Sequence, residues 1–206
     1  MNQQETSSAE NVAWASLNTA MTAEELYAFC SDIERLFRIN PYLEFNKWHK
    51  NDDGSIDISI RNISNQEPVD LETKLSINAQ ENEYEILYSD GIKLRTRFQV
   101  EENETGSSLK IFDEYKHEDV DDEGVLKQVD KSIVAWAKDI QEYIFKWQRW
   151  KWFLPWRWYM QGPWQRMKPP ARRISYMLFW ITFAELLGFF LIFIIFWYDF
   201  DEFFKL

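Results

Sequence analysis

The sequence is poor in the residues that active centres and metal sites most often use. Its 206 residues include one cysteine, Cys30, and two histidines, His49 and His117. A lone cysteine cannot form a disulfide within the chain, and neither histidine has a Cys or His neighbour at zinc-ligand spacing. The sequence also lacks a glycine-rich phosphate loop and a serine nucleophile elbow. We therefore predict no metal site and no cofactor, and we assign no catalytic residue; an enzyme of the cyclase or hydratase kind stays open as the least supported class of function.

Basic residues are scarce in the first two thirds of the chain. The whole chain has a formal net charge of −11, but residues 1–140 hold 29 acidic and 14 basic side chains, a net charge of −15. Nucleic-acid binding depends on Lys and Arg side chains that neutralise phosphates. We therefore exclude nucleic acid as a partner.

The N-terminus lacks the basic and apolar regions of a secretory signal. It reads MNQQETSSAENV, and residues 1–10 are polar enough to predict a disordered tail. We expect the domain that follows to stay in the cytoplasm, where it is made.

One long hydrophobic run lies near the C-terminus. Residues 174–198, ISYMLFWITFAELLGFFLIFIIFWY, include one charged residue, Glu185. At about 1.5 Å per residue this run crosses a hydrocarbon core of about 30 Å. A buried core helix is the alternative, but such helices rarely run this long without a polar stripe. We predict a transmembrane helix at 174–198, with a short acidic tail at 199–206.

The charges beside the run predict its orientation. KPPARR precedes it and DFDEFFKL follows it, and basic flanks stay on the cytoplasmic side. We expect a single-pass protein, in a bacterial inner membrane, with its N-terminal domain in the cytoplasm and its C-terminus outside.

Glu185 needs separate treatment because a carboxyl group inside a span is costly and usually has a partner or a role. Three interpretations stay open: a protonated side chain without a partner, an intramembrane contact with another helix, and proton chemistry.

A basic, tryptophan-rich stretch joins the domain to the run. Residues 141–175 contain eight basic side chains and one acid, Glu142. Indole rings favour the headgroup layer and cations favour anionic lipid, so we expect residues 151–173 to form a juxtamembrane segment in the bilayer interface. The alternative is a docking surface for another membrane protein subunit. The predicted interface residues are Trp147, Trp150, Trp152, Trp156, Arg157, Trp158, Trp164, Arg172 and Arg173.

The first part of the domain reads as a strand followed by two short helices. NVAWASLNT has strand composition, and Thr22 and Glu25 have the spacing of a capping box at the start of a helix. A second helix, IERLFRI, is expected to stop at Asn40 because Pro41 disfavours helical geometry in the residue before it.

Five further segments alternate like strands. Turn pairs such as Asp53-Gly54 and Asp90-Gly91 separate some of them, which predicts an antiparallel meander with one apolar face. The expected inward positions are Ile56, Ile58, Ile60, Val69, Leu71, Thr73, Leu75, Ile77, Tyr84, Ile86, Tyr88, Ile92, Leu94, Thr96, Phe98, Val100, Leu109, Ile111, Asp113, Tyr115 and His117.

A long amphipathic helix, DKSIVAWAKDIQEYIFKW, ends the domain. Asp130 is its expected N-cap, and Ile133, Trp136 and Ile140 recur at helical spacing. We expect this helix to close over the sheet.

This order of elements resembles the helix-grip fold of the START-like (SRPBCC, polyketide cyclase-like) superfamily. The phrase ELYAFCSDIERLFRINPYLEFNKW is similar to the opening of that family, and the resemblance covers residues 11–150. It implies an α+β domain in which a curved antiparallel sheet of about six to seven strands grips the long helix. With the C-terminal span, this is the predicted architecture.

The resemblance also implies a deep apolar cavity that binds lipids, sterols, quinones or polyketides. We expect membrane-anchored binding or transfer of a hydrophobic ligand (lipid, quinone, sterol or terpenoid) at the cytoplasmic face. The alternative is an accessory or assembly subunit of a membrane protein complex. The expected ligand-binding residues are Ile58, Ile60, Thr73, Tyr88, Thr96, Phe98, Asp113, Tyr115, Trp136 and Ile140.

Two local patterns suggest chemistry. Asp113, Tyr115 and His117 share one strand face, so an acid–base relay is sterically conceivable, although we favour a reading in which His117 is solvated at the strand end. Residues 119–130 partly match a calcium loop, but we interpret them as an acidic solvent loop because a strand precedes them.

Overall fold

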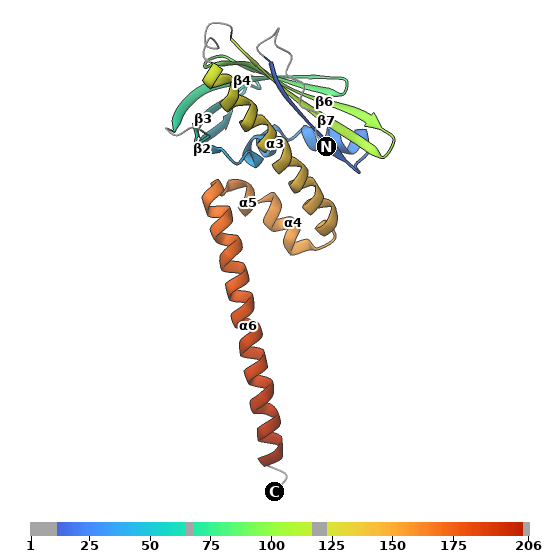
Figure 1. Ribbon diagram of the computed structural model, residues 1–206, viewed down its shortest axis with the longest axis vertical. Helices are drawn as coiled ribbons and strands as arrows, with labels where there is room; N and C mark the ends of the chain where they lie inside the picture. The colour runs from blue at the N-terminus through green and yellow to red at the C-terminus, as the bar shows by residue number, and fades with distance from the viewer. Residues whose placement is uncertain (1–11, 65–67, 117–122, 204–206) are drawn as a thin grey trace. The chain divides into compact units, whose positions relative to one another are not determined.

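The computed structural model describes residues 12–64, 68–116 and 123–203 (Figure 1). The chain divides into two compact units, Met1–Arg166 and Met167–Leu206. Over the described residues, the first unit contains one sheet and five helices, and the second contains one long helix.

The described strands form one seven-stranded antiparallel sheet. Strands β2 to β7 are neighbours in chain order, and β1 pairs with β7 at the far edge, with Ala15 opposite Ile111. This confirms the predicted meander and the α+β class. The strands are β1 (Val12–Thr19), β2 (Leu43–Lys50), β3 (Ile56–Asn62), β4 (Val69–Gln80), β5 (Glu83–Tyr88), β6 (Lys93–Asn103) and β7 (Gly106–Tyr115).

Two short helices follow β1, as predicted. Helix α1 (Ala23–Cys30) begins with the expected capping box, in which the Glu25 amide donates to Thr22 Oγ1 and the Thr22 amide donates to Glu25 Oε2, each at 3.2 Å. Helix α2 (Ile33–Ile39) ends at the residue before Asn40, as the proline rule requires.

The long helix α3 (Glu123–Trp150) begins earlier than the sequence predicted. Asp130 lies inside it and is not its N-cap. The intervening Leu126, Lys127 and Gln128 are good helix formers, which explains the longer helix. Of residues 119–130, interpreted above as an acidic solvent loop, 119–122 lie outside the described residues, and 123–130 are helical, which corrects that interpretation.

The core lies between the inner face of the sheet and α3, which crosses that face in Figure 1. From the sheet, Leu75, Ile86 and Leu109 are fully buried, and Ile133 and Ile140 of α3 are at most 1% exposed. Burying each such side chain contributes about 1.5 to 3 kcal/mol. The alternation of apolar residues therefore determines which face of the sheet α3 covers.

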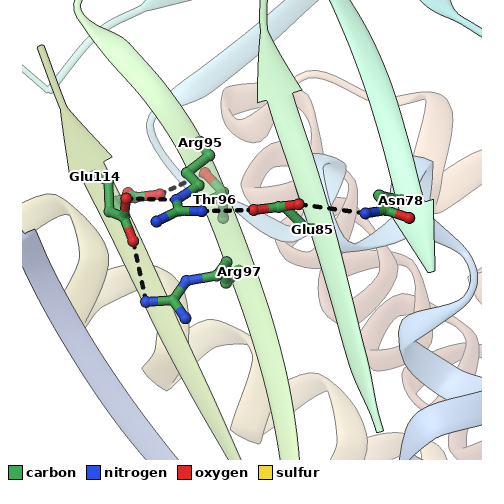
Figure 2. Close-up of polar contacts among 7 residues, drawn as sticks. Asn78, Glu85, Arg95, Thr96, Arg97 and Glu114 are labelled. Carbon is green, nitrogen blue, oxygen red and sulfur yellow. Dashed lines mark hydrogen bonds and ion pairs between the residues drawn. The ribbon is translucent and has the colours of Figure 1, made fainter. Parts of the chain in front are cut away.

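The outer face of the sheet carries a chain of charged side chains (Figure 2). The Arg95 guanidinium lies between Glu85, at 2.9 Å, and Glu114, and Arg97 contacts the other Glu114 oxygen at 3.0 Å. The two carboxylates raise the pKa of Arg95, with Glu114 contributing first. Asn78 donates to Glu85 at 3.5 Å. Four adjacent strands, β4 to β7, are thus linked across their polar face.

Two of the predicted inward positions, Ile92 and Leu94, are wrong because a β-bulge interrupts the alternation of side chains. The pairing steps from Lys93 opposite Tyr115 to Arg95 opposite Glu114, which leaves Leu94 as the extra residue. Ile92 and Leu94 are consequently 44% and 45% exposed, and the alternation is reversed before the bulge.

Two further predicted inward positions, both on β4, lie outside the core. Val69 is 51% exposed and Ile77 is 37% exposed. His117 lies outside the described residues.

Two short helices, α4 (Leu154–Gln161) and α5 (Pro163–Arg166), complete the first unit. Met160 of α4 is 2% exposed and belongs to the same core as the sheet. Pro155 occupies the first turn of α4, where its missing N–H costs nothing.

The second unit is the helix α6 (Pro169–Phe203). Its stretch Pro169–Trp197, 29 residues, is long and apolar enough to cross a membrane, and it buries none of its most apolar segment. Glu185, Arg172 and Arg173 all lie on this helix.

Candidate functional site

The ten residues predicted to bind a ligand all lie on the inner side of the domain. Eight come from β3, β4, β5, β6 and β7, and two come from α3. Each of them is at most 7% exposed. They are Ile58, Ile60, Thr73, Tyr88, Thr96, Phe98, Asp113, Tyr115, Trp136 and Ile140.

A carboxylate lies among these apolar side chains. Asp113 on β7 is 2% exposed, and its Oδ2 atom lies 2.5 Å from the Nζ atom of Lys93. Thr96, directly opposite on β6, donates to Asp113 Oδ1 at 2.5 Å. Tyr115 adds a longer hydrogen bond of 3.4 Å from its hydroxyl to Oδ2. A buried charge is tolerated only when it is paired and hydrogen-bonded, and Asp113 meets both conditions.

The hydrogen bonds of the Tyr88 and Thr96 hydroxyl groups each have a defined donor and acceptor. Thr96 gives its single hydroxyl proton to Asp113, so the Tyr88 hydroxyl is the donor in the 3.0 Å contact between Tyr88 and Thr96. Burial, and then the charge of Asp113, raises the pKa of Tyr88 well above its usual value. The tyrosine therefore keeps its proton, and a chain runs from Tyr88 through Thr96 to Asp113.

Lys93 is the accessible end of this network. Its side chain is 30% exposed, and its ammonium nitrogen lies 5.9 Å from the centre of the Tyr115 ring and 5.8 Å from that of Trp136. An ammonium group has three N–H donors, and one of them satisfies Asp113. The ammonium group therefore has further donor capacity on a side chain that is 30% exposed.

Aromatic rings occupy the middle of the inner face. Trp136 meets Phe37 of α2 and Phe98 of β6 edge to face, with 5.4 Å between ring centres in each pair. The Trp136 indole donates to the Leu36 carbonyl oxygen at 2.8 Å. Leu36 is in the last turn of α2, where carbonyl groups lack helical partners. Trp136 therefore joins α3 to both α2 and the sheet.

Sequence reasoning missed two contributors to this region. The alternation that places Ile92 and Leu94 inward would place Lys93 outward, and the bulge reverses this. The sequence contained a signal, since a buried Asp113 requires a cation and Lys93 is the first residue of β6, the strand that pairs with β7. Phe37 was read as part of a helix, without a prediction of which strand it would face.

Asp113 accepts hydrogen bonds from Lys93, Thr96 and Tyr115. His117, the third member of the conceivable acid–base relay, lies outside the described residues. Burial raises the pKa of the Cys30 thiol to about 12, so this thiol is protonated at neutral pH and is a poor nucleophile. The described residues hold no group of three or more metal-ligating side chains.

A solvent-open groove of about 490 Å³ lies elsewhere on the first unit. It runs between the end of β1, at Thr19, and the C-terminal part of α3, at Ile144 and Phe145. None of the ten predicted ligand residues lines this groove.

The predicted interface tryptophans divide into two groups. Trp147, Trp156 and Trp164 are partly buried and pack against the core. Trp150, Trp152 and Trp158 are exposed by 42%, 73% and 72%. Arg157 is exposed on α4, while Arg172 and Arg173 lie near the start of α6. Glu185 lies midway along α6.

Comparison with known proteins identifies the fold. No family model and no curated protein matches the sequence. Among solved structures, a START superfamily protein from Mycobacterium smegmatis is 16% identical, with a TM-score of 0.51 over 66% of this chain and 97% of that one. A protein from Thermus thermophilus is 12% identical, with a TM-score of 0.51 over 64% of this chain and 94% of that one. The first unit therefore has the START-like helix-grip fold.

Proposed function

We propose that the chain binds a hydrophobic ligand of the lipid, quinone, sterol or terpenoid class between the sheet and α3. The observation that carries the proposal is the buried chain of Tyr88, Thr96 and Asp113, which ends at the part-exposed ammonium group of Lys93. A mostly apolar site with a few placed polar groups is the usual form of a small-molecule site. Here the polar groups are already held in place by one another.

The network suggests which end of a ligand it receives. The free donors of Lys93 suit a carbonyl, hydroxyl or carboxylate oxygen, and the rings of Tyr115 and Trp136 flank that position. The apolar part of the ligand would then contact Phe98, Ile140 and their neighbours on the inner face. Because aromatic rings occupy that region, ligand entry requires Trp136 to move.

We also propose that α6 anchors the protein in the membrane as a single span. Arg172 and Arg173 precede the most apolar part of the helix, and a basic flank favours the cytoplasmic side. The first unit would then take its ligand from, or deliver it to, the cytoplasmic leaflet. Protease protection in sealed vesicles tests this orientation. A cytoplasmic first unit should be digested in inside-out vesicles, where the cytoplasmic face is exposed, and protected in right-side-out vesicles.

Photocrosslinking tests the ligand proposal. The full-length protein in mild detergent is mixed with a fatty acid or an isoprenoid quinone that carries a diazirine in its apolar tail, irradiated, and mapped by peptide mass spectrometry. We expect adducts on β6, β7 and α3 peptides, and competition by the unmodified compound. Adducts confined to α6 would contradict an inner-face site.

An accessory or assembly subunit of a membrane protein complex is the second candidate. Its support is the packing of Trp136 against Phe37 and Phe98, which makes the region a filled core, together with Glu185, which needs a partner in hydrocarbon. A stoichiometric protein that copurifies with the wild type in mild detergent, and is lost on Glu185→Leu, would favour this function over the first.

A further inference from the structure

The turn between α3 and α4 exposes a group of large apolar side chains, which we call the aromatic tip. Trp152, Leu154 and Trp158 are each more than 70% exposed, and Trp150 and Phe153 are 42% and 45% exposed. They form one surface: the rings of Trp150 and Trp152 stack at 6.4 Å, and those of Trp152 and Phe153 lie 5.8 Å apart. Leu154 and Trp158 are four residues apart on one side of α4.

Basic side chains alternate with the residues of the tip. Arg149, Lys151 and Arg157 are all exposed, and the Arg149 guanidinium lies 5.9 Å from the centre of the Trp150 ring. No acidic residue occurs in the sequence between Glu142 and Glu185. Lys and Arg beside exposed indole rings suit anionic headgroups with apolar chains beneath them.

The rest of the domain differs from the tip in charge and in burial. Residues 1–140 carry a net charge of −15, so an anionic surface repels them and attracts the tip. Trp147, Trp156 and Trp164 pack against the core and fix α4 and α5 to it. Trp152 and Trp158 are instead more than 70% exposed, and an exposed apolar patch of this kind marks an interaction surface.

We propose that the aromatic tip is a second membrane contact, by which the first unit itself docks on an anionic bilayer. The proposal goes beyond ligand binding and rests on α6 spanning that bilayer. Only Met167 and Lys168 separate α5 from α6, so the chain keeps the first unit near the membrane. Such a tether makes even weak docking effective, because the effective concentration is high.

Spin-label accessibility tests the proposal on the full-length protein. In a Cys30→Ala background, a nitroxide is attached after Trp152→Cys, Trp158→Cys, Leu87→Cys or Phe190→Cys. Leu87 is the matched control, because it is an apolar residue 41% exposed on β5, and Phe190 reports on α6. Each protein is reconstituted in vesicles of phosphatidylcholine with phosphatidylserine, and accessibility to oxygen and to a water-soluble nickel complex is measured.

We expect the oxygen-to-nickel accessibility ratio at the two tip positions to exceed that at Leu87 severalfold. The excess should fall in phosphatidylcholine alone, and in a variant with Arg149→Glu, Lys151→Glu and Arg157→Glu. Tip labels as accessible to nickel as the Leu87 label, with the Phe190 label in lipid, would overturn this inference and leave the anchor intact. A water-accessible Phe190 label would instead refute the anchor on which it rests. The inference would also be overturned if a copurifying protein protected the tip labels from nickel to the same extent with and without anionic lipid.

Discussion

Lys93 and Asp113 pair across the junction of β6 and β7, with 2.5 Å between Nζ and Oδ2, although Lys93 is next to a bulge and Asp113 is in the core. The bulge at Leu94 turns Lys93 to the same face as Tyr115, its pairing partner on β7. A local irregularity of one strand thus supplies the cation that a buried carboxylate on the next strand requires.

Replacing Lys93 should destabilise the domain strongly. In Lys93→Met the Asp113 carboxylate loses its counter-ion while still buried, at a cost of about 2 to 4 kcal/mol, below that of a fully buried pair because Lys93 is 30% exposed. Urea unfolding of the full-length protein in detergent, followed by near-ultraviolet circular dichroism, measures the change.

Lys110→Met is the control for that measurement. Lys110 pairs with Glu101 at 2.7 Å on neighbouring strands, but the two side chains are 36% and 39% exposed, so its loss should cost less than about 1 kcal/mol. Adding Asp113→Asn to Lys93→Met should recover part of the stability, because no charge is then buried. Equal losses in the two single variants would contradict the role assigned to the inner pair.

Trp136 should be the most sensitive residue of α3. Trp136→Ala removes the ring that contacts Phe37 and Phe98, and we expect a loss of about 3 to 5 kcal/mol. Trp136→Phe keeps a ring there but loses the hydrogen bond to Leu36, at a cost of about 1 to 2 kcal/mol. The same unfolding assay should rank the two variants in this order, and an equal effect would mean that the hydrogen bond outweighs the packing.

Buried Cys30 should contribute to instability in alkali. Its folded pKa is raised from 9.0 to about 12, so the folded state keeps a proton that the unfolded state releases. The protonated thiol contributes fully to the free energy of unfolding below pH 9. This contribution declines by about 1.4 kcal/mol per pH unit between the two pKa values. Unfolding free energies of wild type and Cys30→Ala, measured between pH 8 and about 10.5, should diverge in slope above pH 9. Parallel slopes would show that the thiol titrates normally in the fold.

Gly106 should not tolerate a side chain. Its φ is +150°, and a Cβ atom there would lie 2.3 Å from the Thr19 carbonyl oxygen of the neighbouring strand. Gly106→Ala should therefore cost about 2 to 4 kcal/mol. Gly54→Ala is the control, since φ is +83° but nothing lies within 4 Å, and it should cost about 1 kcal/mol. Thermal unfolding should separate the two variants by several degrees.

Local rules predicted much of this fold. The capping box at Thr22 and the stop before Pro41 depend on neighbours in sequence, and strand alternation placed Thr96, Phe98 and Asp113 on the buried face. These features follow from the geometry of single elements.

Other features required pairing between distant segments. The bulge at Leu94 exists only in the register of β6 against β7, so alternation alone could not turn Lys93 inward. The tryptophans between 147 and 164 all have similar basic and aromatic neighbours in the sequence, so the sequence does not separate the buried ones from the exposed ones. Only the packing of α4 and α5 against the core distinguishes Trp156 from Trp158.

Native mass spectrometry of the full-length protein tests the central claim most directly. The protein is extracted in mild detergent, and any bound molecule is released and identified by its mass and fragments. We predict a defined apolar molecule with an oxygen-bearing end, retained by wild type and by Lys93→Arg and depleted in Lys93→Met. A protein that carries no such molecule, or one whose occupancy is the same in Lys93→Met, would contradict a ligand site at the Lys93–Asp113 pair.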